Sequence, residues 1–139
     1  MKALKLIAPL FALGIGLSGA AHAQATMDAA TADKTAVKVR QVTYKCTTGG
    51  TTKVTYGFNK QKLPTYAEAN LGGKTRFLPI NLDRSDVAGT FFGDEDSWQI
   101  GSDALTLNNY HKSDVLIQDP SANTAYKGCK VSKVKRIKG

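Results

Sequence analysis

The segment VTYKCTTGGTTKVTYGF, residues 42–58, consists of two runs of alternating apolar and polar side chains around a turn. The apolar residues recur at every second position and define one face in each run: Val42, Tyr44 and Cys46, then Val54, Tyr56 and Phe58. A two-residue period is typical of a half-buried β-strand, and the β-branched and aromatic residues found here favour strands. Residues 47–50 include two glycines, which are typical of a turn. The segment therefore predicts a β-hairpin.

The same alternation extends along most of the chain, and no segment has a convincing helical period. Further strands are expected at residues 65–71, 74–79, 87–92, 97–101, 104–107, 115–117 and 124–129. Short antiparallel strands at this spacing form a small barrel or sandwich, and a closed barrel leaves no exposed sheet edge. We predict an all-β fold, a small antiparallel β-barrel of about eight strands.

The two ends of the chain depart from this pattern. Residues 1–23 contain Lys2 and Lys5, an apolar stretch and a small-x-small sequence, which is the order of a secretory signal peptide. Residues 24–36 are small, polar and aperiodic, so we expect a flexible leader. The barrel domain is expected at residues 37–129 and a basic tail at residues 130–139. The signal peptide predicts export to an extracytoplasmic, oxidising compartment, the periplasm or the outer surface.

The sequence has two cysteines, Cys46 and Cys129. In an oxidising compartment two cysteines most simply pair with each other. Two free thiols or an intermolecular bridge are the alternatives. An intramolecular disulfide would connect the first and last parts of the predicted barrel domain. In the chain-entropy model, closing such a long loop stabilises the fold by about 4–5 kcal/mol.

Residues suited to catalysis are few. After the predicted signal peptide, His111 is the one histidine, and it lies in a polar run that is expected to be a loop. Any Ser-His-Asp or Cys-His arrangement would have to use it. Asp94, Glu95 and Asp96 lack the ligand spacing of an EF-hand loop, and there is no glycine-rich phosphate loop. The sequence therefore favours a binding protein over an enzyme, with no metal and no other cofactor.

The charge of the chain is strongly positive. It has 19 Lys and Arg against 11 Asp and Glu, a formal net charge of +8. Basic charge with aromatic residues suits a nucleic-acid-binding barrel, but export argues against nucleic acid as a partner. The basic tail is either a solvated terminus or a contact with an anionic envelope surface, such as lipid, glycan or polyphosphate.

The run VTYGFNKQ, residues 54–61, and the run NLDRSD, residues 81–86, carry a family resemblance. On these residues the chain resembles the adhesin complex proteins of Gram-negative pathogens, over about residues 42–129. That family is similar in fold to the membrane-bound and periplasmic inhibitors of c-type lysozyme. The resemblance implies a barrel closed by a Cys46–Cys129 disulfide. It also implies inhibition of c-type lysozyme by loops that occlude the active-site cleft, together with a role as a surface adhesin.

The resemblance does not carry the inhibitors' binding residues over directly. Their Ser-x-Ser-Gly-x-x-Tyr stretch compares with residues 86–92, where Gly89 matches but Ala88 and Phe92 replace a serine and the tyrosine. Ile100 replaces the lysine of their second stretch. We therefore expect lysozyme contacts from nearby turns. The candidate lysozyme-binding residues are Ser85, Asp86, Asp94, Glu95, Asp96, Trp98, Tyr110, His111 and Lys112.

Charge complicates a lysozyme partner, because c-type lysozymes are also basic and net repulsion slows association. Six acidic residues nevertheless lie within residues 83–103. An acidic face that meets lysozyme, with the basic tail turned elsewhere, is the hypothesis that reconciles the two. The alternative function is a surface binding module for a host glycan, a host protein or an anionic ligand, without lysozyme inhibition.

Overall fold

The computed structural model describes residues 25–139, so the predicted signal peptide lies outside the described residues. The strands are β3 (Lys38–Lys45), β4 (Thr51–Phe58), β5 (Pro64–Leu71), β6 (Lys74–Pro79), β7 (Thr90–Phe92), β8 (Gln99–Ser102), β9 (Val115–Gln118) and β10 (Thr124–Lys138). Two short helices accompany them, α2 (Ala29–Thr35) and the 3₁₀ helix η1 (Tyr110–Lys112). Within residues 25–139, no helix has the length and apolar character needed to cross a bilayer.

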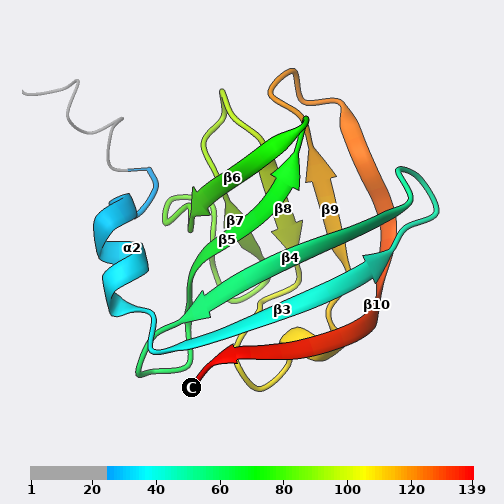
Figure 1. Ribbon diagram of the computed structural model, residues 1–139. Helices are drawn as coiled ribbons and strands as arrows, with labels where there is room; N and C mark the ends of the chain where they lie inside the picture. The colour runs from blue at the N-terminus through cyan, green and yellow to red at the C-terminus, as the bar shows by residue number, and fades with distance from the viewer. Residues whose placement is uncertain (1–24) are drawn as a thin grey trace, which may run out of the picture.

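The eight strands form one antiparallel sheet that curls into a nearly closed barrel (Figure 1). The strand order is β6-β5-β4-β3-β10-β9-β8-β7. The two outermost strands come together at an isolated bridge between Ile80 and Phe92. Beside it, the Gly93 N–H donates to the Pro79 carbonyl at 2.9 Å. The predicted all-β barrel is confirmed.

The alternating face of the β3–β4 hairpin fills the barrel. Val42, Tyr44, Val54, Tyr56 and Phe58 are completely buried. They reach the interior because successive strand residues point to opposite sides of the sheet. Their polar neighbours on the same strands form the outer surface.

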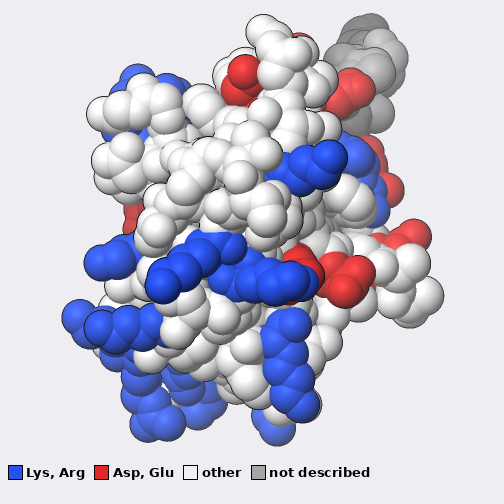
Figure 2. All heavy atoms as spheres, turned by 90° about the vertical axis from the view of Figure 1, so that its right-hand side faces the viewer, with Lys and Arg blue, Asp and Glu red and all other residues white. Residues whose placement is uncertain are grey.

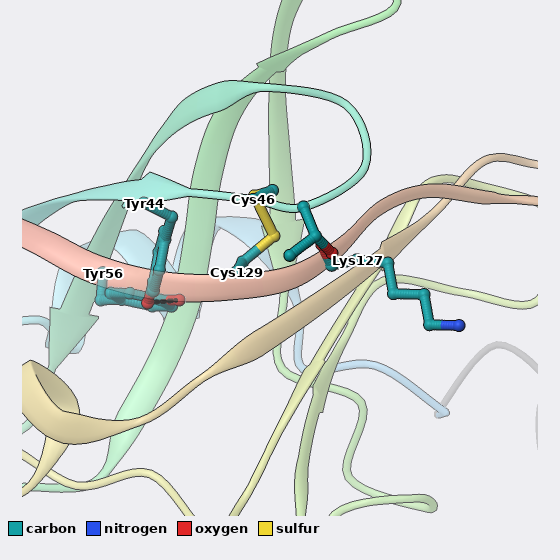
Figure 3. Close-up of a disulfide and its surroundings, with 6 residues drawn as sticks. Tyr44, Cys46, Tyr56, Lys127 and Cys129 are labelled. Carbon is teal, nitrogen blue, oxygen red and sulfur yellow. Dashed lines mark hydrogen bonds between the residues drawn. A yellow bond between two sulfur atoms is a disulfide. The ribbon is translucent and has the colours of Figure 1, made fainter.

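The Cys46–Cys129 disulfide is present, and it fastens the end of β3 to β10 (Figure 3). Beneath it the Tyr44 and Tyr56 hydroxyl groups share a hydrogen bond of 2.7 Å inside the barrel. Burial raises the pKa of Tyr44, and it raises the pKa of Tyr56 well above its ordinary value. Both phenols therefore remain protonated in the folded protein far into the alkaline range.

The basic tail predicted at residues 130–139 is instead mostly strand. β10 runs through to Lys138 and turns a corner on the way (Figure 1). Its first part pairs with β9 up to Cys129, and its second part pairs with β3 from Lys130 to Lys138. The tail prediction missed this pairing because the apolar residues recur every three positions, where β-bulges interrupt the two-residue alternation.

The flexible leader predicted at residues 24–36 is wrong over helix α2. The Asp28 carboxylate caps this helix by accepting the Thr31 N–H at 3.1 Å. The Thr65 hydroxyl of β5 donates to the Ala32 carbonyl at 2.8 Å, and Ala32 is fully buried. A seven-residue helix that packs through alanine leaves little periodic signal in the sequence.

Two predicted strands are also shorter or absent. The strand expected at residues 87–92 begins at Thr90, because residues 86–89 form a turn with Val87 97% exposed. The strand expected at residues 104–107 is a loop. Its shape is fixed by Asn109, whose side chain accepts the Thr106 N–H and donates to the Ala104 carbonyl, both at 2.8 Å.

Candidate functional site

The strand register divides the candidate residues between two ends of the barrel. Gln99 pairs with Gln118, whereas Ser102 pairs with Val115. The turn at residues 93–98 therefore lies at the same end as the β9–β10 loop, which we call the Trp98 end. Helix η1 precedes β9 and lies at the opposite end, which we call the Tyr110 end.

The turn between β7 and β8 carries three exposed carboxylates, those of Asp94, Glu95 and Asp96. Its backbone is held by Ser97, whose Oγ accepts the Asp94 N–H at 3.0 Å. The Gln99 side chain donates to the Asp94 carbonyl at 2.9 Å. Among residues 25–139, none of the three carboxylates forms an ion pair. They are presented to solvent on a well-supported turn, which we call the acidic turn.

Trp98 follows the acidic turn and lies half-buried against the main core. Its ring also covers the β5–β6 turn, since a Cβ placed on Gly72 would come 2.9 Å from the Trp98 Cζ2 atom. The Trp98 ring is therefore held in place beside the acidic turn.

Ser85 and Asp86 shape the segment that leads into β7. The Asp86 Oδ1 accepts the N–H groups of Ala88 at 2.8 Å and Gly89 at 3.1 Å. The Ser85 Oγ accepts the Phe91 N–H at 2.9 Å. Both side chains are thus already used in local hydrogen bonds, although Asp86 remains exposed.

The third group of candidates lies at the Tyr110 end. Tyr110 is buried, with its ring centroid 5.5 Å from that of Phe58, so it presents little surface to a partner. His111 and Lys112 are exposed beside it. The structure therefore brings Trp98 to the acidic turn but separates both from residues 110–112. Phe92 and Ile100, at the positions where the inhibitors have polar residues, belong to the core.

Positive charge gathers on one side of the barrel, on the adjacent strands β10, β3 and β4. These three strands contain no acidic residue. Figure 2 looks onto this side and shows Lys and Arg side chains gathered over its lower half. We call its exposed members the basic face: Lys45, Lys53, Lys127, Lys130, Lys133, Lys135, Arg136 and Lys138. The sequence alone indicates only the tail as basic, because the pairing of the tail with β3 cannot be seen in it.

A polar groove of about 600 Å³ adjoins the basic face on the outer surface of β3, β4, β5 and β6. Tyr126 of β10 also lines it. Its polar side chains come from neighbouring strands: Gln41, Lys53, Thr55, Glu68, Asn70 and Thr75. The groove offers hydroxyl, amide, ammonium and carboxylate groups close together, and the alternating polar positions of the strands supply most of them.

The sequence profile of the ACP-like domain matches residues 40–131. The chain belongs to the ACP-like domain family. The solved structure of the Adhesin Complex Protein from Neisseria meningitidis is similar to this ACP-like domain, with 40% sequence identity and a TM-score of 0.62. That alignment covers 66% of this chain and 98% of the Neisseria chain. No curated protein matches the chain. The family resemblance inferred from residues 54–61 and 81–86 is confirmed.

Proposed function

We propose that this ACP-like domain is a non-catalytic binding protein of the adhesin type, exported to the bacterial surface or periplasm. The observation that carries the proposal is the 40% identity to a protein named as an adhesin complex protein, over 98% of that protein's length. A stable barrel with exposed turns suits a binding role, since loops on a rigid scaffold commonly carry recognition.

We further propose that one target is c-type lysozyme, whose cleft the acidic turn enters. This proposal rests on the turn's three free carboxylates beside the fixed Trp98 ring. In the strand order, β7 and β8 lie across the barrel from β3 and β4. A basic partner that approaches the acidic turn thus meets local attraction while the basic face points away. Such local complementarity improves association despite the net charge.

The test is lysis of a peptidoglycan cell suspension by a c-type lysozyme, titrated with the oxidised protein comprising residues 24–139. We expect a stoichiometric loss of lysis. The charge reversal Glu95→Lys/Asp96→Lys should weaken inhibition by about tenfold or more, because it places repulsive charges at the contact.

The matched control is Asp33→Lys/Asp103→Lys. It changes the net charge by the same amount, but at exposed residues of α2 and of the loop after β8. It should retain most inhibition. Equal weakening by both variants would show that net charge alone matters and would reject the acidic turn as the contact. No inhibition by folded wild-type protein in large excess would reject lysozyme as the target and leave the adhesin-type role.

A further inference from the structure

The outer side of β10 carries a row of lysines. Lys130, Lys133 and Lys135 lie opposite outward-facing residues of β3, whereas Arg136 lies opposite the buried Arg40. Followed along the bent strand, the row from Lys127 to Lys138 is about 35 Å long, at roughly 3.3 Å per strand residue. Strand register extends it sideways, because Lys133 lies opposite Thr43, and Thr43 lies opposite Lys53. Like charges brought this close, with Asp114 beside Lys130 as the one acidic partner in an ion pair among the described residues, repel one another, so a bound polyanion would relieve their repulsion.

The basic face has little internal neutralisation. Among residues 25–139, Lys130 and Asp114 form the single ion pair, at 2.8 Å, with both side chains more than half exposed. The family match ends at residue 131, so Lys133, Lys135, Arg136 and Lys138 lie beyond it. These four cations therefore lie outside the segment that the family profile matches.

The polar groove continues from this row across the sheet. Lys135 lies opposite Gln41, Gln41 opposite Thr55, and Thr55 opposite Glu68 on the same outer surface. Asn70 and Thr75 form the neighbouring pair. Hydroxyl and amide groups of this kind match the hydrogen-bonding groups of sugar rings. The groove holds one ammonium group, of Lys53, and one carboxylate, of Glu68, so it suits uncharged sugar hydroxyls and leaves anionic substituents to the lysines of β10.

We propose that the basic face and the polar groove together bind a linear sulfated polysaccharide. The sulfate groups contact the lysines of β10, and sugar hydroxyls occupy the groove. The choice of a sulfated chain rests on the proposed adhesin-type role, because sulfated polysaccharides are abundant on animal cell surfaces. The attraction between a row of lysines and a polyanion depends on how many lysines replace counterions along the polymer.

The bend of β10 favours a polymer over a membrane. The strand pairs with β9 up to Cys129 and then turns to follow β3, so its cations lie around a corner of the barrel (Figure 1). A flexible chain can follow such a convex path along its whole length. A flat bilayer would contact only part of the row.

The experiment measures binding of heparin oligosaccharides of increasing length to the full oxidised protein by titration calorimetry over a range of salt concentrations. Affinity should rise with length until the oligosaccharide spans the row. Lys133→Gln/Lys135→Gln should reduce affinity by about tenfold or more and lower the salt slope by about two units. Thr55→Val/Thr75→Val should reduce affinity without changing that slope, because it removes hydroxyl groups and no charge.

The matched control is Lys60→Gln/Lys74→Gln, which removes two exposed lysines from the β4–β5 turn and from β6. It should bind nearly as the wild type does. Equal losses in the two lysine variants, or a Thr55→Val/Thr75→Val affinity equal to that of the wild type, would overturn the proposed site. Tighter binding to phosphatidylglycerol vesicles than to heparin would overturn it in favour of a membrane surface.

The heparin-binding test can fail or succeed independently of the proposed adhesin-type and lysozyme-binding functions. Heparin binding by purified protein requires neither lysozyme nor cells. If the protein fails to adhere to cells yet binds heparin through Lys133 and Lys135, only the adhesin-type role is rejected. Inhibition of lysozyme should persist in Lys133→Gln/Lys135→Gln, because the acidic turn lies on strands across the barrel.

Discussion

Tyr44 and Tyr56 form a buried pair of phenols joined by one hydrogen bond. Burial raises the pKa of each above its ordinary value. In the unfolded chain, both phenols lose their protons near pH 10, whereas the folded protein retains them. The stabilisation is therefore complete below about pH 10 and is lost as the pH rises further.

We predict that the free energy of unfolding falls above about pH 10 by roughly 1.4 kcal/mol per pH unit for each of the two tyrosines. Urea denaturation at several alkaline pH values measures this slope. Tyr44→Phe/Tyr56→Phe should show a shallower slope, because the double change removes both ionisable groups without leaving one hydroxyl unpaired. Lysines also titrate in this range, but they do so in both proteins and do not affect the difference between them. Identical slopes would contradict the conclusion that the buried tyrosines cause the loss of stability.

At the scale of single residues, the sequence predicts the inward side chains of the hairpin correctly. The two-residue period identifies Val42, Tyr44, Val54, Tyr56 and Phe58, and all are buried. It fails for Tyr110, which sits in a polar run yet packs on Phe58 through the short helix η1. A single aromatic residue in a one-turn helix has no periodic neighbours to indicate its direction.

At the scale of elements, β10 is held in place by a buried charged side chain on β3. The guanidinium of Arg40 donates to the Lys138 carbonyl at 2.9 Å and to the Gly139 carbonyl at 3.0 Å. Arg40 is 7% exposed, and its one other acceptor is the adjacent Val39 carbonyl at 3.1 Å, so two of its three hydrogen bonds depend on the end of β10. The end of β10 is thus part of the fold as well as a carrier of charge.

Deletion of residues 132–139 should lower the free energy of unfolding by about 3 kcal/mol or more, because it removes two of the three carbonyl acceptors of the buried Arg40 guanidinium and the strand that pairs with β3. Denaturant unfolding of the purified proteins measures the difference. Lys133→Gln/Lys135→Gln removes exposed charge but keeps the strand, and its stability should stay within about 0.5 kcal/mol of the wild type. A deletion as stable as the wild type would show that β10 contributes nothing beyond residue 131.

The sequence reveals the regular strands better than the irregular elements. The long alternating runs of β4, β5 and β6 are predicted almost to their ends. The second part of β10 is not, because its two β-bulges shift which residues face the barrel. The relation of the acidic turn to residues 110–112 is also hidden, since it depends on the register of β8 with β9. Local patterns contain no information about that register.

At the scale of the whole molecule, the disulfide spans most of the barrel. Cys46 and Cys129 are separated by 83 positions. We predict that Cys46→Ala/Cys129→Ala lowers the free energy of unfolding by about 4–5 kcal/mol, because a cross-link over a long loop mainly restricts the unfolded chain. Denaturant unfolding of the oxidised wild type and the variant tests this. Reduced wild-type protein is the control and should behave like the variant, and a loss below about 1 kcal/mol would contradict the prediction.

The placement of β10 between β3 and β9 also affects how quickly the native state can form. Arg40 and its hydrogen-bond acceptor Gly139 are separated by 99 positions, and β3 lacks its second neighbour until these distant parts of the chain meet. The β3–β4 hairpin, in contrast, needs only a local turn. Barrels dominated by such distant pairings fold in milliseconds to seconds, far more slowly than helical bundles. During that interval the hairpin edge that β10 finally covers is open to other chains.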